Sequence, residues 1–125
     1  MEENYSVKII ESSRELDARG RLAMKDLANA QKFDELEPGA VLAITPVDWA
    51  VLKVSNPKAE RKEYDVYVVI DSEGNKYYTS SEAFWSAFKA IADEMGDEDF
   101  SITVYKCESK NYKGKYFITC SIIWN

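Results

Sequence analysis

The sequence has 125 residues, 46% hydrophobic and 30% charged, which suits one folded domain and leaves no room for a second independent one. The formal net charge of −6 excludes a protein that is basic throughout, and the absence of histidine removes the commonest general base from any catalytic scheme. No apolar run approaches the length of about 18 residues that crosses a membrane, and the first residues resemble no targeting signal, so we expect a cytoplasmic protein.

The segment before Ala40 is ambiguous. Residues 14–36 contain strong helix formers interrupted by Gly20, whereas residues 21–30 could also form a strand. We expect one strand somewhere in residues 5–30. Residues 1–19 are interpreted as an N-terminal extension, and residues 20–125 as the folded domain.

Two strands are predicted next. Residues 40–54 are rich in β-branched and aromatic side chains, and Pro46 offers a bulge, so one long, bent strand is expected. In residues 62–72 the side chains of Val66 and Val68 share one face, and those of Tyr67 and Val69 share the other. A turn over residues 71–75 then leads into residues 76–79 as a hairpin return.

A helix follows this hairpin. Residues 79–82 have the spacing of a capping box with Thr79 as the cap. Apolar residues then recur at three- and four-residue intervals up to Met95, and Gly96 stands where a left-handed C-terminal cap is needed. The aromatic residues expected in the core by their spacing are Phe84, Trp85, Phe88, Phe100 and Phe117.

Two last strands, at residues 100–107 and 116–124, are joined by a basic turn. The complete order predicts a mainly β fold, a five-stranded barrel of the oligonucleotide-binding (OB) type with one helix between strands three and four, plus the N-terminal extension. The alternative is a mixed α+β sheet packed on one helix.

The sequence contains no recognisable catalytic or metal-binding motif. Cys107 and Cys120 lie too far apart along the predicted hairpin for a disulfide, and both suit structural roles. The acidic clusters lack the spacing of a calcium loop, and the glycines are scattered singly, without a phosphate-binding loop. We therefore expect a protein that is not an enzyme and that uses no metal or cofactor.

Basic and aromatic residues concentrate near the C-terminus. Residues 100–125 carry four lysines against Glu108 alone, a local net charge of +3, whereas residues 1–99 carry 12 basic and 21 acidic residues, a net charge of −9. Tyr112 stands at the tip of the lysine-rich turn, where it has little core to join. Proteins that bind single strands combine lysines for the phosphates with aromatic rings for the bases. By charge alone, solvated loops would fit equally well.

A second basic and aromatic edge is predicted around residues 53–62. Together the two edges give one set of candidate nucleic-acid-binding residues, which are Trp49, Lys53, Lys58, Arg61, Lys62, Tyr67, Tyr105, Lys106, Lys110, Tyr112, Lys113, Lys115 and Tyr116.

Three stretches carry a family resemblance: ANAQKFDELEPGAVLAI at residues 28–44, DSEGNKYYTSSEAF at 71–84 and FSITVYKCESKNYKGKYFITCSI at 100–122. In these the chain resembles the single-stranded-DNA-binding proteins of tailed bacteriophages. The resemblance implies an OB-fold protein that coats single-stranded DNA without strong sequence preference during phage DNA replication or recombination in the bacterial host cell. It implies contact with DNA over residues 105–116, phage or host replication proteins as further partners, and a monomer or weak homo-oligomer.

The acidic majority of the chain motivates an alternative of another class. A net charge of −9 over residues 1–99 would also suit a phage-encoded protein-interaction module, such as an inhibitor that mimics DNA.

Overall fold

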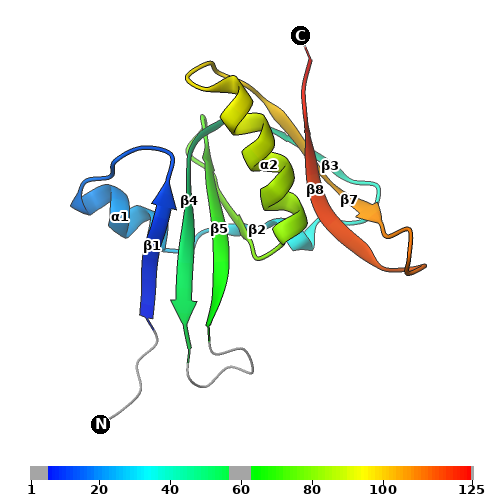
Figure 1. The fold of residues 1–125 in the computed structure, drawn as a ribbon, viewed down its shortest axis with the longest axis horizontal. Helices are drawn as coiled ribbons and strands as arrows, with labels where there is room; N and C mark the ends of the chain where they lie inside the picture. The colour runs from blue at the N-terminus through cyan, green and yellow to red at the C-terminus, as the bar shows by residue number, and fades with distance from the viewer. Residues whose placement is uncertain (1–5, 57–62, 125) are drawn as a thin grey trace.

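The computed structural model describes residues 6–56 and 63–124, which form two open sheets and two helices (Figure 1). The strands are β1 (Ser6–Ser12), β2 (Gln31–Lys32), β3 (Val41–Ile44), β4 (Pro46–Ser55), β5 (Glu63–Asp71), β6 (Lys76–Thr79), β7 (Ile102–Glu108) and β8 (Tyr116–Ile122). The helices are α1 (Ala18–Lys25) and α2 (Glu82–Met95), and a 3-10 turn, η1, spans Phe33–Glu35. The five-stranded sheet has the order β1-β4-β5-β6-β2, and the three-stranded sheet has the order β3-β7-β8. Neither described helix is long and apolar enough to cross a membrane.

The predicted closed barrel is wrong, because the described strands leave both sheets open. Closure would require β8 to pair with β6. The edge of β6 that faces away from β5 is instead occupied by β2, which runs parallel to it with Gln31 opposite Tyr77. The strand β8 ends the three-stranded sheet and packs against α2 instead, where Ser81 Oγ donates to the Ile118 carbonyl at 3.3 Å and Ile118 shares a core with Phe84. The fold is therefore a mixed α/β arrangement.

The long, bent strand predicted at residues 40–54 is present as β3 and β4, which are separated by Thr45. The pairing of β4 with β5 shifts register between Pro46 and Asp48, as the bulge predicted there implies. Because β3 pairs with β7 while β4 pairs with β5, one stretch of chain belongs to both sheets. The bend is fastened by a hydrogen bond of 2.6 Å between the hydroxyls of Thr45 and Ser101.

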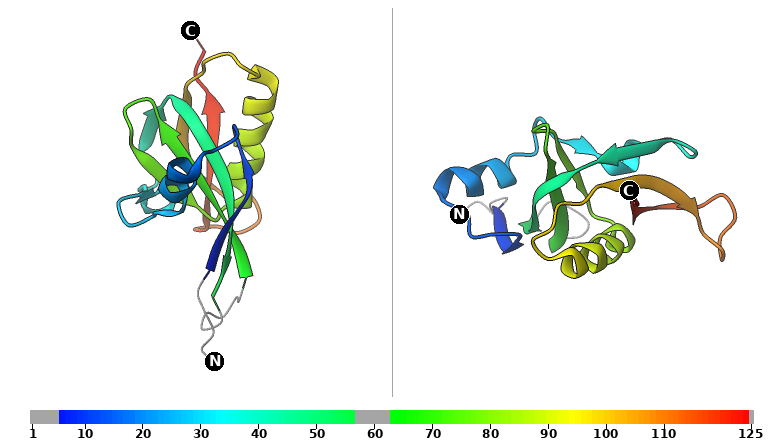
Figure 2. Two further views of the ribbon diagram at one scale, coloured as in Figure 1. Left: turned by 90° about the vertical axis from the view of Figure 1, so that its left-hand side faces the viewer. Right: turned by 90° about the horizontal axis from the view of Figure 1, so that it is seen from above.

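The two faces of the five-stranded sheet support two hydrophobic cores. On one face Val69 meets α2 and the inner face of the three-stranded sheet, and the side chains of Phe84 and Phe88 are fully buried there. On the other face α1 inserts Met24 against Leu52. Figure 2 shows the two helices on opposite sides of this sheet. The alternation predicted for β5 is confirmed, because Val66 and Val68 face the α1 side while Val69 faces α2.

Helix α2 ends at Met95 as predicted, with Gly96 at φ +62°, but its N-cap differs from the prediction. Ser81 is the cap, and its hydroxyl accepts a hydrogen bond of 3.2 Å from the Phe84 amide. The buried Thr79 hydroxyl donates instead to Asp34 Oδ1 at 2.6 Å, which ties β6 to η1. Thr79 lies in β6, so it cannot cap a helix that begins three residues later.

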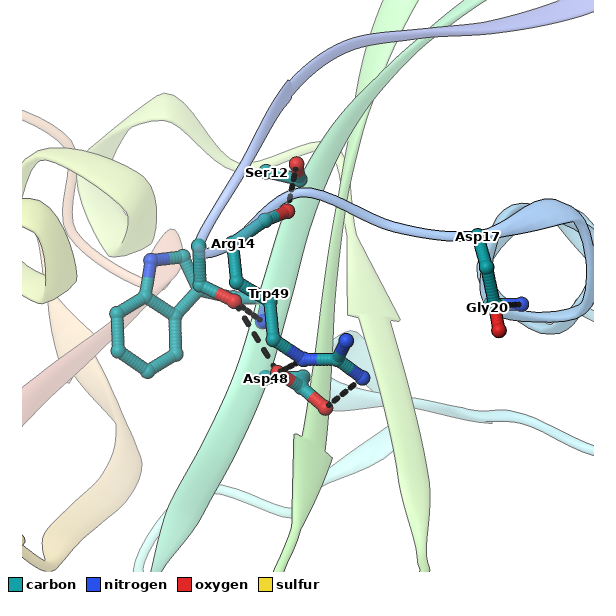
Figure 3. Close-up of polar contacts among 7 residues, drawn as sticks. Ser12, Arg14, Asp17, Gly20, Asp48 and Trp49 are labelled. Atoms are coloured by element: carbon teal, nitrogen blue, oxygen red, sulfur yellow. Dashed lines mark hydrogen bonds and ion pairs between the residues drawn. The ribbon is translucent and has the colours of Figure 1, made fainter.

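Residues 6–12, within the segment interpreted as an N-terminal extension, form a strand of the five-stranded sheet. The strand expected within residues 5–30 is β1, which pairs antiparallel with β4, whereas Ala18–Lys25 is helical. Figure 3 shows how the link after β1 is held. In the figure Arg14 donates to both carboxylate oxygens of Asp48, at 2.8 and 3.2 Å. The Ser13 amide also donates to the Trp49 carbonyl at 2.8 Å. The pKa of Arg14 is raised by this bond to Asp48 and by the charge of the same carboxylate.

Candidate nucleic-acid-binding surface

The hairpin of β7 and β8 carries most of the predicted site. Its ladder runs from Ile102 opposite Ile122 to Glu108 opposite Tyr116. The Ser109 amide then donates to the Lys115 carbonyl at 2.8 Å, and the Gly114 amide donates to Glu108 Oε2 at 3.2 Å. Gly114 has φ +80°, which only glycine adopts readily. The turn is thus a defined structure that extends beyond the core (Figure 1).

Positive charge is uncompensated at this turn. Lys110, Lys113 and Lys115 are exposed, and none of them forms an ion pair with any described residue. The single acid of the hairpin, Glu108, accepts the Gly114 amide described above. By contrast, Lys53 lies 3.9 Å from the carboxylate of Asp65. The lysines of the turn therefore remain available to an anionic partner.

Three aromatic side chains of the hairpin are exposed. The exposed fraction is 67% for Tyr112 at the tip, 47% for Tyr116 and 39% for Phe117. The prediction that Phe117 is a core residue is wrong. The flanking residue Ile118 takes the buried position, so strand alternation turns Phe117 to the opposite face of the sheet.

We call that opposite face of the three-stranded sheet the outer face. Its members share one parity in the pairing register and are all exposed or half-buried: Val41, Ala43, Thr103, Tyr105, Cys107, Phe117, Thr119 and Ser121. The opposite parity points inward, and Ile102, Val104, Ile118 and Cys120 join the core between the sheets. None of the outer-face residues belongs to either described hydrophobic core. The signal for Phe117 in the sequence would have been this register, counted from the turn.

Tyr105 and Lys106 are neighbours in β7 and therefore lie on different faces. Tyr105 is on the outer face, where its hydroxyl forms a hydrogen bond of 2.8 Å with Ser121 Oγ. Lys106 is half-buried on the inward side, opposite Ile118. Only Tyr105 thus shares a surface with Phe117.

The rings of Trp49 and Tyr67, two predicted contacts, are engaged within the fold. Trp49 packs edge-on against Phe88, with ring centroids 5.1 Å apart. Tyr67 is only 6% exposed and stacks on Trp85, with centroids 4.9 Å apart and planes inclined by 7°. Burial, followed by the charges of Asp65 and Glu82, raises the pKa of Tyr67. Neither ring stands free to receive a base.

Lys53, the basic residue of the second edge that the structure describes, lies away from the hairpin. Lys53 lines a shallow cavity of about 170 Å³ together with Glu63, Asp65 and Glu82, so its surroundings are acidic. In Figure 1 the ends of β4 and β5 nearest this cavity point away from the β7–β8 hairpin. The remaining members of this edge, Lys58, Arg61 and Lys62, lie outside the described residues.

Both cysteines are free thiols with different surroundings. Cys107 is half-buried on the outer face, whereas Cys120 is buried in the core, where burial raises its pKa from the usual 9 to about 12. Across residues 6–56 and 63–124, no three histidine, cysteine, aspartate or glutamate side chains gather where they could hold a metal ion.

No protein-family model, curated protein or solved structure matches the chain. The resemblance to phage single-stranded-DNA-binding proteins therefore stays a prediction from the three sequence stretches.

Proposed function

We propose that the protein binds single-stranded DNA at the turn of the β7–β8 hairpin, without catalysing a reaction. The observation that supports this most directly is Tyr112, which is 67% exposed at the tip among three exposed lysines that lack ion-pair partners in the described structure. A ring and cations at one turn can serve a base and its flanking phosphates together. Each stacked base contributes about 1–3 kcal/mol in such proteins.

The chemistry of the turn favours unpaired DNA and tolerance of sequence. In a duplex the faces of the bases are covered by their neighbours, so a tyrosine ring can stack only on a base that is free of the helix. Lysine ammonium groups act as point charges, without the fixed fork that lets arginine read a guanine edge. We therefore expect contact with phosphates and base faces and little selection among sequences.

The biological setting belongs to the same proposal. The resemblance of the three stretches to phage proteins is our reason for proposing a role in phage DNA replication or recombination in the cytoplasm of a bacterial host. We propose a monomer or weak homo-oligomer, with phage or host replication proteins as further partners.

The direct test is the anisotropy of a fluorescently labelled oligo(dT) titrated with the protein at several salt concentrations. Three lysines that neutralise phosphates should give a log–log salt slope of about −2, since each releases about 0.7 counterion from a single strand. An RNA oligonucleotide and a DNA duplex of equal length serve as comparisons. If oligo(dT) does not bind even at the lowest salt concentration, the proposal is wrong, and the acidic protein-interaction module becomes the better hypothesis.

A further inference from the structure

We infer that the outer face of the three-stranded sheet is a base-stacking platform that continues the binding surface from the hairpin turn, with Phe117 and Tyr105 as its aromatic residues. This inference rests on the proposed binding of single-stranded DNA and adds a second part to that site. It assigns base stacking to Phe117, a residue predicted from the sequence to lie in the core.

The pairing register of β7 and β8 sets the spacing between Phe117 and Tyr105 on the outer face. Phe117 lies opposite Cys107, and Tyr105 lies opposite Thr119, so Phe117 and Tyr105 are diagonal neighbours across β7 and β8. The hydrogen bond to Ser121 directs the Tyr105 ring away from Phe117, and the α-carbons of diagonal neighbours in a sheet are already about 7–8 Å apart. This is about twice the 3.4 Å that separates successive bases of a duplex strand. Bases stacked on both rings must therefore belong to an extended, unpaired strand.

Within residues 6–56 and 63–124, neither hydrophobic core includes a residue of the outer face. Val41, which lies opposite Tyr105 on β3, is 65% exposed, and Phe117 is 39% exposed, although both are large and apolar. The hydrogen bond between the Tyr105 hydroxyl and Ser121 Oγ already holds the Tyr105 ring in one direction. A contiguous apolar and aromatic face in contact with water is characteristic of a binding surface. A ring held in place before binding also loses less side-chain entropy when a base stacks on it.

The distribution of charge selects nucleic acid as the occupant. All members of the outer face are uncharged, and the next position of the same parity beyond Phe117 is Lys115, followed by the other lysines of the turn. A polyanion can lay its bases on the uncharged face and its phosphates along this basic end. A second copy of the chain, docked face to face, would instead offer these lysines no anionic partner from its own uncharged outer face.

Two variants of Phe117 test the platform by oligo(dT) anisotropy. Phe117→Ala should lower the affinity by about fivefold or more, with an unchanged salt slope, because a stacking contact and no cation is lost. Phe117→Leu, which keeps apolar volume without an aromatic face, should recover only part of the loss. The matched control is Leu22→Ala on α1, an exposed apolar residue at 67% that lies away from the hairpin, and it should bind as wild type does.

Cys107 gives a second readout on the unmodified protein. It lies directly opposite Phe117 and is half-buried, so a bound strand should cover it. Saturating oligo(dT) should slow alkylation of Cys107 by iodoacetamide at least fivefold, while buried Cys120 reacts only in the unfolded chain. Suppose that wild type binds oligo(dT). If Cys107 is then alkylated equally fast with and without oligo(dT), or if folded Phe117→Ala binds as wild type does, the inference of a platform is wrong and the turn alone binds DNA. Failure of wild type to bind at all contradicts the proposed function instead.

Discussion

Replacing Lys113 and Tyr112 separately by alanine should divide the binding free energy into a charge part and a stacking part. Both side chains are exposed on the turn, and Lys113 has no ion-pair partner among the described residues, so its removal leaves no carboxylate unpaired. At 0.7 counterion per phosphate, three lysines give a slope of about −2.1, and two give about −1.4. A fourfold rise in salt should then weaken wild type about 18-fold and Lys113→Ala about 7-fold.

Tyr112→Ala should behave differently in the same plot. The variant should bind about 5- to 150-fold more weakly at every salt concentration, which corresponds to about 1–3 kcal/mol of stacking, along a line parallel to that of wild type. Binding is measured at a temperature where circular dichroism shows that each variant is fully folded.

The control for charge is Lys8→Ala, which removes an exposed lysine from β1, distant from the hairpin. It should leave the slope unchanged. The reasoning is refuted if Lys8→Ala lowers the slope as much as Lys113→Ala does, because binding would then depend on overall charge and not on the turn. A wild-type affinity for Tyr112→Ala would equally remove the stacking role of the tip.

The remaining predictions concern stability. Asp71→Ala should lower the free energy of unfolding, measured in urea, by about 2–3 kcal/mol, because the Asp71 carboxylate accepts hydrogen bonds from turn amides and from the buried Tyr77 hydroxyl at 3.3 Å. Asp71→Asn should lower it by less. Equal stability of wild type and both variants would contradict this prediction. Gly114→Ala should cost about 1 kcal/mol in thermal unfolding through its positive φ alone, because no atom lies within 4 Å of the added methyl group. Burial raises the pKa of the Cys120 thiol from 9 to about 12, so this thiol ionises at lower pH in the unfolded chain than in the folded one. The free energy of unfolding, measured in urea at each pH, should therefore fall as the pH rises from 9 to 12. The fall should be smaller in Cys120→Ala.

The local elements of this fold could be predicted from sequence, whereas the closure of its sheets could not. Helix α2 was predictable because periodicity and Gly96 act within one element. The prediction of a closed barrel was wrong because the outer edge of β6 pairs with Gln31–Lys32, two polar residues that have no sequence pattern typical of a strand. Such an edge pairing depends on a contact between distant segments, which no local pattern records.

The candidate site divides in the same way. The tip of the hairpin was predictable, because a tyrosine among lysines in a turn has no core to join. Phe117 is the one apolar residue on the face of β8 that also carries Thr119 and Ser121, so only the register counted from the turn, and not its own apolar character, places it outside. The burial of Tyr67 could not be predicted either, because its ring is covered by Trp85, which belongs to another element, α2.

The sharing of one bent strand between the two sheets has a consequence for the order of folding. Both partners of β4, the strands β1 and β5, precede α2 in the chain, so the five-stranded sheet can begin to pair while residues after α2 are still being synthesised. The strand β3 cannot, because Val41 pairs with Tyr105, far along the chain. Contacts of such sequence separation slow folding, and a nascent chain that stops after α2 leaves the aromatic core of Phe84 and Phe88 without the strands that cover it. The β7–β8 hairpin is therefore expected to be the last part to acquire structure, and incomplete chains are expected to need protection from aggregation.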